Sequence, residues 1–380
     1  MTESVELLAE LVKRPSQNPM GLASPGPGFF ESAVTDFLEG LLRQWDVHYE
    51  RQSVAPQRDN IVAYLPGEAS APSFIWEAHQ DTVPAVSMTV EPFAAQLKNG
   101  RLYGRGACDV KGGLAAMLAA FHRLLREPAS RRCSITLACV VDEEYTFTGV
   151  RALAAKPLRA DGAIVAEPTS LHIITAHKGI VRWRLHTSGR SCHSSRPELG
   201  INAIYRMGRV IAAIESYAAW LSTTRQDAVL GPATISVGRI EGGVSANIVP
   251  DSCTIDIDRR VLPREKLETV PAELAEYLVH RLGAEGWRQE APWMQVPPLA
   301  HEGKERLVAR LAEAVRQVLG QVEVGTVPYG TDASTLQAVG IPCVVFGPGD
   351  IAQAHTAEEW VDVHQVEQAA EILYHFALLR

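Results

Sequence analysis

The strongest constraint on the fold of this chain comes from short, almost unbroken apolar runs that end in turns or charged residues. These runs cover residues 74–78, 135–141, 163–166 and 342–346. Runs of this kind are typical of strands that helices cover on both faces, as in a mostly parallel α/β sheet. Helix-spaced apolar residues at 114–125 and 365–379 provide candidates for those covering helices. We therefore expect an α/β domain with a mostly parallel mixed sheet flanked by helices.

The middle of the chain has a different hydrophobic pattern. Apolar residues alternate with polar residues in 181–186, 234–237 and 253–258. Alternation with period two is typical of an antiparallel sheet with one solvated face. Helical stretches near 201–220 and 264–282 interrupt this pattern, so we expect an inserted α+β domain. The predicted boundaries are 176–289 for the inserted domain and 1–175 with 290–380 for the α/β domain.

Composition excludes several classes of protein. A chain of 380 residues with 46% hydrophobic and 21% charged residues is typical of a folded protein with two domains. A net charge of −8 without a basic cluster argues against a nucleic-acid partner. We expect no signal peptide and no membrane span, because no apolar segment is long enough. Scattered cysteines without a C-x-x-C pair indicate reduced thiols and a cytoplasmic protein.

Acidic residues and histidines follow the predicted parallel strands. They are His79, Asp81, Glu143, Glu144, Glu167 and His355, while Asp109 lies in a glycine-rich turn before the helix at 114–125. The carboxyl ends of strands in an open α/β sheet form the usual ligand site, so these side chains should converge. Buried charges of this kind need partners or a metal. Two histidines and three carboxylates without cysteine suit one or two divalent ions of zinc, cobalt or manganese.

His79, at the end of the strand predicted at 74–78, has an acidic neighbour, Asp81, whose side chain should lie on the same side of the strand. Side chains at i and i+2 of a strand share a face, so His79 and Asp81 should point the same way. A carboxylate can then accept the ring N–H and leave the other nitrogen free for a metal. The alternative is a hydrogen-bonded histidine at a strand end, since His-x-Asp alone is a weak motif.

Six motifs occur along the chain in the order in which they occur in a known enzyme family. They are His79-Gln80-Asp81-Thr82-Val83-Pro84, the glycine-rich turn at 104–113, Asp142-Glu143-Glu144, Ala166-Glu167-Pro168-Thr169, Gly347-Pro348-Gly349 and Ala354-His355-Thr356. The chain resembles the co-catalytic zinc metallopeptidases, a family that includes acetylornithine deacetylase, succinyl-diaminopimelate desuccinylase, aminoacylase and glutamate carboxypeptidase. The resemblance covers nearly the whole chain. It implies a catalytic metal-binding domain and an inserted lid and dimerisation domain.

The resemblance also implies roles for the acidic residues and histidines. His79 and Glu167 would bind one metal ion, Glu144 and His355 would bind the other, and Asp109 would bridge the two. Asp81 would orient His79. Glu143 would be the general base that takes a proton from the metal-bridging water and passes it to the leaving nitrogen. The residues alone leave open which of Glu143 and Glu144 is the ligand and which is the base.

The inserted domain carries further matches to the family. The segments 191–197 and 200–204 resemble its lid and dimerisation segment, in which a histidine, here His193, stabilises the oxyanion in a neighbouring subunit's site. Asn247 and either Arg259 or Arg260 would hold the substrate, with a guanidinium group suited to a carboxylate. Arg260 has the better spacing to Leu262-Pro263, and Arg259 stays open. The alternatives are a surface histidine in a loop and solvated arginines on a sheet face.

The expected function is therefore that of a metal-dependent amide hydrolase. The resemblance implies removal of an acyl group from an N-acyl amino acid, as in acetylornithine deacetylase, with two divalent ions, zinc first and cobalt or manganese as alternatives. A dipeptidase or carboxypeptidase is the alternative, because the reaction centre is shared. A non-catalytic relative is a third hypothesis, which predicts a missing ligand or base. The implied partners are an N-acyl amino acid or dipeptide and a second copy of the chain, through the inserted domain.

Two acidic residues near these motifs are interpreted as structural. Thr331-Asp332 precedes the short segment 333–339, so we interpret this pair as a helix cap. Glu359 follows the last motif, and we interpret it as a solvated side chain. The sequence contains neither a Gly-x-Ser-x-Gly motif nor a phosphate-binding loop, so a serine hydrolase or a nucleotide enzyme has no support.

Overall fold

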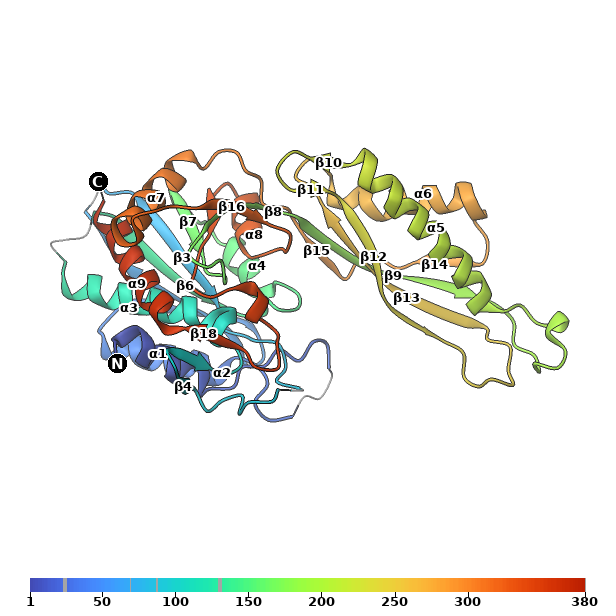
Figure 1. Ribbon diagram of the computed structural model, residues 1–380, viewed down its shortest axis with the longest axis horizontal. Helices are drawn as coiled ribbons and strands as arrows, with labels where there is room; N and C mark the ends of the chain where they lie inside the picture. The colour runs from blue at the N-terminus through green and yellow to red at the C-terminus, as the bar shows by residue number, and fades with distance from the viewer. Residues whose placement is uncertain (23–25, 69, 87, 129–131, 380) are drawn as a thin grey trace. The chain divides into compact units, whose positions relative to one another are not determined.

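The computed structural model of the chain comprises two compact units. The residues that it describes are 1–22, 26–68, 70–86, 88–128 and 132–379. The first unit contains residues 1–175, 301–325 and 331–380, and the second contains residues 176–300 and 326–330. Figure 1 shows the elements of each unit with their labels.

The first unit is built on a mixed sheet whose central strands are parallel. Among the described residues its strand order is β1 (Tyr49–Ala55), β2 (Arg58–Leu65), β6 (Ser134–Val140), β3 (Ser73–His79), β7 (Gly162–Val165), β17 (Cys343–Val345), β8 (Ile173–His177) and β16 (Val324–Val327). Strand β3 pairs in parallel with β6 and β7, and β17 pairs in parallel with β7. The expected fold class, an α/β domain around a mostly parallel sheet, is confirmed.

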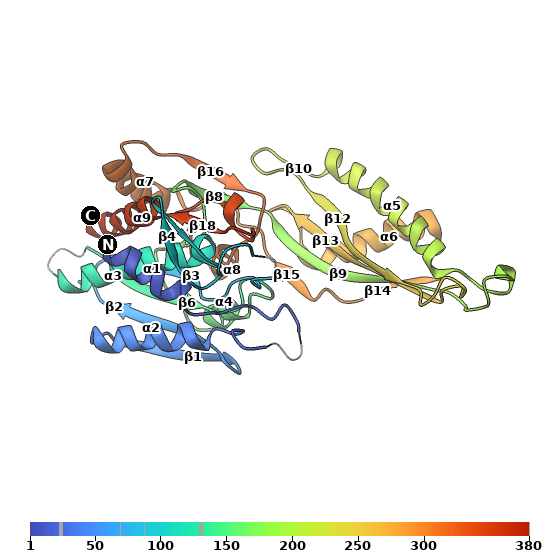
Figure 2. The same ribbon diagram turned by 60° about the horizontal axis from the view of Figure 1, so that its bottom comes forward.

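Helices cover both faces of this sheet (Figure 2). They are α1 (Glu3–Val12), α2 (Ser32–Gln44), α3 (Gly112–Arg126), α4 (Thr148–Ala154), α7 (Glu305–Leu319), α8 (Ala333–Ala338) and α9 (Val363–Leu378). Trp76 of β3 packs into a large core with α1, α3 and α9. The next side chain, Glu77, points to the other face, where α4 and α8 pack against each other.

A small antiparallel sheet is formed by segments that adjoin two of the metal-ligand candidates along the chain, Asp109 and His355. Strands β4 (Gln96–Lys98) and β5 (Arg101–Tyr103) form a hairpin, and β18 (Trp360–Asp362) pairs with β5. Asn99 and Gly100 both have positive φ, 52° and 76°, as a two-residue turn of this type requires. The third strand thus brings the end of the segment that contains His355 next to the turn that precedes Asp109.

The second unit is an antiparallel sheet covered by two helices on one face, within the described residues. Strand β9 (Gly179–Ser188) pairs with β13 (Ser252–Val261), β14 (Trp287–Gln289) and β15 (Met294–Val296), while β12 (Thr234–Gly242) pairs with β13. Trp183 and Ile255 pack against α5 (Ala203–Thr224) and α6 (Val270–Leu282). The chain returns to the first unit at residue 301 and not at 290, because β15 still pairs with β9.

Helix α4, which follows the Asp142-Glu143-Glu144 motif, has Gly149 in its first turn, in close contact with the backbone of Val141. This contact predicts the effect of a substitution on stability. A Cβ atom at Gly149 would lie 2.2 Å from the carbonyl oxygen of Val141 and 2.4 Å from its nitrogen. We expect Gly149→Ala to lower the free energy of unfolding by about 1–3 kcal/mol, because backbone atoms must move. Gly40→Ala, on the exposed side of α2 with nothing within 4 Å, should raise it by about 0.5–1 kcal/mol. Urea unfolding of both variants measures the difference, and equal effects would contradict this account of the contact.

Candidate metal centre

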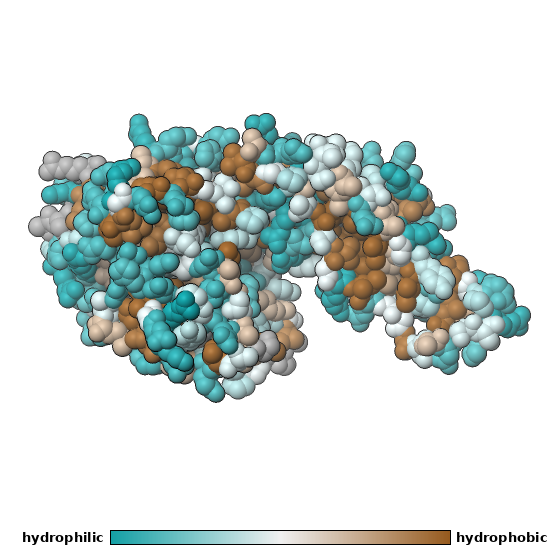
Figure 3. Space-filling view, in the orientation of Figure 1, coloured by the Kyte–Doolittle hydropathy of each residue, from teal (hydrophilic) through white to brown (hydrophobic). Residues whose placement is uncertain are grey.

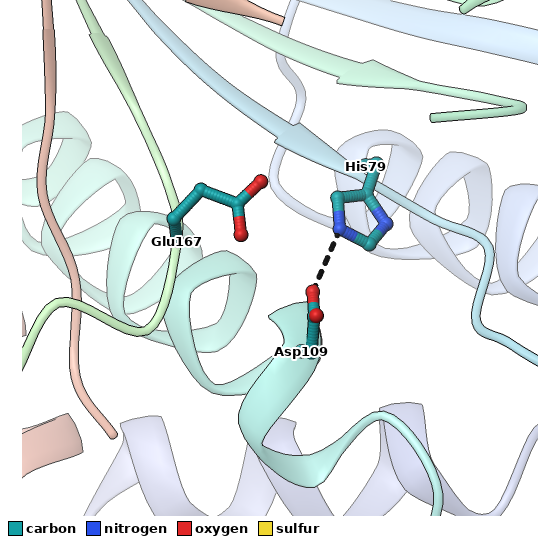
Figure 4. A group of neighbouring side chains, drawn as sticks. All are labelled: His79, Asp109 and Glu167. Atoms are coloured by element: carbon teal, nitrogen blue, oxygen red, sulfur yellow. Dashed lines mark hydrogen bonds and ion pairs between the residues drawn. The ribbon is translucent and has the colours of Figure 1, made fainter. Parts of the chain in front are cut away.

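Three buried side chains converge at the carboxyl ends of β3 and β7. His79 is the last residue of β3, Glu167 follows β7, and Asp109 lies in the irregular turn that precedes α3. Their nitrogen and oxygen atoms lie within 4.8 Å of one another, and His79 Nε2 is 3.1 Å from Asp109 Oδ1 (Figure 4). The open sheet therefore brings together residues that are far apart in the sequence, as its topology requires.

A second group shares Asp109 with the first. Asp109, Glu144 and His355 also place nitrogen and oxygen atoms within 4.8 Å of one another. His355 Nε2 lies 3.2 Å from Glu144 Oε2 and 3.3 Å from Asp109 Oδ2. The two carboxylate oxygens of Asp109 thus face different histidines. This is the arrangement that a carboxylate between two cations requires.

The burial of these groups sets their electrostatics. Burial raises the pKa of Glu143 and Glu167 well above the ordinary value and raises the pKa of Glu144 to about 7. Burial also opposes ionisation of Asp109, but hydrogen bonds from His355 and His79 hold the pKa of Asp109 well below its usual range. The site therefore gathers carboxyl groups whose ionisation is opposed by burial. The donor set of imidazole nitrogens and carboxylate oxygens fits two divalent ions, which would stabilise the ionised carboxylates.

Asp81 holds the backbone of the loop that carries Glu143 and Glu144. Asp81 Oδ1 accepts the Glu143 N–H at 3.1 Å, and Asp81 Oδ2 accepts the Glu144 N–H at 3.2 Å. Asn18 Nδ2 donates a further hydrogen bond to Asp81 Oδ2 at 2.8 Å. Asp81 is completely buried, so these bonds replace the water that its carboxylate lacks.

The main chain of Asp81 fixes the ring of His79. His79 Nδ1 lies 2.9 Å from the carbonyl oxygen of Asp81, and 3.6 Å from its carboxylate. A carbonyl oxygen only accepts, so Nδ1 carries a proton, and Nε2, which faces Asp109 in this structure, is the nitrogen that would bind a cation. The side chain that was expected to orient His79 mainly holds Glu143 and Glu144, and the neighbouring carbonyl group holds the ring.

Glu143 and Glu144 occupy different positions. Glu144 approaches His355 and also accepts the Val83 N–H at 3.2 Å, whereas Glu143 belongs to neither group of ligand atoms. Glu143 is nevertheless buried beside the same charges, since His79 and Glu144 both affect its pKa. The geometry therefore separates one carboxylate that lies among the ligand candidates from one that is free to accept a proton.

The candidate residues of the second unit differ in exposure. His193 and Asn247 are exposed and lie on neighbouring segments, because His193 forms a β-bridge with Ile248. Arg259 is 1% exposed and donates to Glu265 and to the carbonyl oxygen of Arg260. Arg260 points to the opposite, partly solvated face of β13, where Nε donates to Asp258 at 2.7 Å.

One interpretation from the sequence is wrong, and one acidic residue was missed. Glu359 is completely buried rather than solvated. Asp332 is the N-cap residue of α8, and the Ala333 N–H donates to Thr331 Oγ1 at 3.3 Å, although the Asp332 side chain itself makes no capping bond. The missed residue is Glu77, whose carboxyl faces that of Asp332 in the interior. A glutamate inside an otherwise apolar strand was the available signal for Glu77, since Glu is almost never fully buried without a partner.

The Glu77 and Asp332 pair predicts a pH-dependent stability. Burial raises the pKa of Glu77 to about 8, and burial beside Glu77 raises the pKa of Asp332 well above its ordinary value. The carboxyl of Glu77 keeps its proton in the folded state while the unfolded chain releases it above about pH 4.5. Its contribution to stability is therefore lost as the pH rises from about 4.5 to 8.

We compare the free energy of unfolding of Glu77→Gln with that of the wild type at two pH values. We expect this difference, variant minus wild type, to be roughly 2–4 kcal/mol larger at pH 8 than at pH 5. The amide can donate to Asp332 at every pH. Urea unfolding of the chelated protein, followed by tryptophan fluorescence, measures this difference. The exposed Glu198→Gln variant controls for the loss of one negative charge. Parallel pH profiles for Glu77→Gln and the wild type would contradict the raised pKa of Glu77 in the folded protein.

The fold and the paired ligand groups define a metallohydrolase. The profile of peptidase family M20/M25/M40 matches residues 75–379, and the chain belongs to this family. An acetylornithine deacetylase from Proteus mirabilis is 33% identical, over 97% of this chain and 94% of that protein. An acetylornithine deacetylase from Myxococcus xanthus is 31% identical, over 90% of each chain. No described helix is both long and apolar enough to cross a membrane.

Solved structures share the fold. A family M20 metallo-carboxypeptidase from Sulfolobus solfataricus aligns with a TM-score of 0.81, at 20% identity, over 100% of this chain and 99% of that one. A dinuclear metal-binding peptidase of the same family from Bacillus subtilis aligns with a TM-score of 0.69, at 18% identity, over 99% of this chain and 96% of that one. The expected family and enzyme class are confirmed.

Proposed function

We propose that this protein is a deacylase of N-acyl amino acids that uses two divalent metal ions, zinc first and cobalt or manganese as alternatives. The observation that carries the proposal is Asp109, whose two oxygens face His79 and His355 separately. The relatives named acetylornithine deacetylase, at 31% and 33% identity, support the deacylase branch of the family. The substrate class is then a small N-acylated amino acid.

His79, Glu167 and Asp109 would hold one ion, and Asp109, Glu144 and His355 would hold the other. Two ions bound there would acidify a water molecule and polarise the amide carbonyl. Glu143 is the proposed general base, because it is buried beside both groups without belonging to either. Its carboxylate takes the proton of the attacking water and delivers it to the leaving nitrogen. The bond from the acyl carbon to nitrogen breaks, and a carboxylate and an amine leave.

Arg260 is the proposed partner of the substrate carboxylate, together with Asn247. Arg259 is a poor candidate, since its guanidinium group already binds Glu265 in the interior and a second carboxylate would compete with that pair. Among the described residues, Arg260 forms an ion pair with the partly exposed Asp258 alone, and its side chain is 27% exposed. A guanidinium group on a solvated face can exchange such a partner for a ligand carboxylate at low cost.

His193 is the proposed donor to the developing oxyanion, acting in the site of a second subunit. The Ser195 N–H donates to His193 Nδ1 at 3.2 Å, so this nitrogen is the acceptor and Nε2 carries the proton. His193 thus presents an N–H to an incoming oxygen, which is the role that the reaction requires.

An exposed sheet edge supports the homodimer that this role requires. Strand β12 is the edge of its sheet, and Ile240 on it is 54% exposed. The apolar side chains Val244, Tyr205 and Ile248 are also exposed, at 92%, 71% and 40%, and line one pocket of the same unit. Figure 3 shows apolar side chains gathered on the second unit around β12. Unpaired strand edges with apolar side chains are favourable surfaces for pairing with another chain.

A substrate panel tests the proposed activity. Zinc- or cobalt-loaded enzyme should hydrolyse at least one of a set of N-acetyl, N-succinyl and N-formyl amino acids, as followed by release of free amine. Glu143→Ala should retain both metal ions but lose about 10²–10⁴-fold in kcat, because it removes the base. Asp109→Ala should lose the metal ions, since both ligand groups share it. No turnover on any acyl amino acid would overturn the proposal.

A dipeptidase or carboxypeptidase is the second candidate. The support is the fold shared with the Sulfolobus carboxypeptidase and with human carnosine dipeptidase 1, which aligns with a TM-score of 0.75 at 15% identity over 99% of this chain and 96% of that one. Dipeptides added to the same panel distinguish the two. Turnover of dipeptides alone would assign the chain to the peptidase branch.

The proposed role of His193 predicts a dimer that is needed for activity. Light scattering should give twice the chain mass of 41.4 kDa, and Ile240→Lys at the strand edge should give a monomer with little activity. His193→Ala should remain a dimer, and its kcat should fall by a larger factor than its KM changes. A mixture of inactive Glu143→Ala and inactive His193→Ala chains should recover activity, because each mixed dimer contains one complete site. A monomeric wild type with full activity would contradict the role of His193.

A further inference from the structure

Glu359 makes a dense set of contacts with the turn that contains Asp109. The side chain is completely buried. Its Oε2 accepts Arg105 Nη1 at 2.5 Å and the Gly106 N–H at 3.0 Å. Its Oε1 accepts the N–H groups of Cys108 and Asp109, both at 3.0 Å. One carboxylate therefore binds three main-chain donors and one guanidinium group of a single turn.

The same residue belongs to the segment that carries the other histidine. Glu359 follows His355 by four positions and directly precedes β18. Its carbonyl oxygen accepts the Gly104 N–H at 3.0 Å, and Arg105 Nη2 lies 3.4 Å from the carbonyl oxygen of Thr356. Glu359 thus connects the turn of Asp109 to the segment of His355 through its main chain as well as its side chain.

We propose that Glu359 is a positioning residue that holds the Asp109 carboxylate in place for both metal ions. This inference rests on the proposed metal-dependent function. Asp109 donates its own N–H to Glu359, so the orientation of the bridging residue depends directly on this contact. Because Asp109 is common to both ligand groups, movement of its turn changes both groups at once. Residues that support metal ligands in this way commonly set metal affinity.

A glutamine at this position is a sharp test because it keeps the shape and removes one acceptor. In the wild type both carboxylate oxygens face donors only. The amide nitrogen of Glu359→Gln must therefore face either the Arg105 and Gly106 pair or the Cys108 and Asp109 pair. A donor opposite buried donors leaves them without partners, so the turn has to shift.

Glu265 in the second unit offers a matched control. Its side chain is 9% exposed, and its carboxylate binds the Arg259 guanidinium group at 2.5 Å and the Leu262 N–H at 2.8 Å. Glu265→Gln therefore removes the same kind of charge-assisted contact, but in the unit without metal-ligand candidates among its described residues. Both variants should lose stability as metal-free proteins, and only one should lose metal affinity.

Metal affinity is measured by competition between each protein and a chromogenic zinc chelator, without substrate. We expect Glu359→Gln to bind zinc about 10–100-fold more weakly at both sites, with circular dichroism that still shows a folded protein. Glu265→Gln should bind two zinc ions with wild-type affinity. Wild-type affinity in Glu359→Gln, or equal loss in both variants, would overturn the positioning role. A wild type that binds no zinc would instead refute the proposed function itself.

Discussion

The Asp109 carboxylate between His79 and His355 is the interaction on which the rest of this structure depends. Buried carboxylates repel one another, and burial together with the charge of Asp109 raises the pKa of Glu143, Glu144 and Glu167. Cations bound to these oxygens would relieve this repulsion. Burial destabilises the carboxylates when no cation is bound, and for that reason it favours metal binding. The free-energy cost of burying these carboxylates without cations is therefore the physical basis of the proposed metal binding.

The loops around the site are arranged to keep this charge in place. The carboxylate of Asp81 binds the main chain of Glu143 and Glu144, and the carboxylate of Glu359 binds the main chain of the Asp109 turn. In each case a buried acid accepts backbone N–H groups, which are fixed donors that stabilise its negative charge. The acidic side chains near the site thus fall into two groups, those that would bind the proposed cations and those that hold the loops.

Much of the fold could be predicted because periodicity and turn chemistry are local properties. The parallel strands around β3, the hairpin at Asn99-Gly100 and the two long helices of the second unit follow from such patterns. The short strands β14 and β15 have too few residues to show a period, and nothing in the sequence indicates that they pair with β9. The second unit therefore continues to residue 300, beyond the predicted boundary at 289. Glu77 was missed and Glu359 was misjudged because their burial depends on tertiary contacts, which residue type alone does not reveal.

The central claim is that Asp109 joins two metal ions, and anomalous X-ray scattering from zinc-loaded crystals tests it most directly. The account predicts two zinc peaks about 3.5–4 Å apart, one on each side of the Asp109 carboxylate. One peak should lie beside His79 and Glu167, and the other beside Glu144 and His355. A single peak, or peaks away from Asp109, would contradict the account.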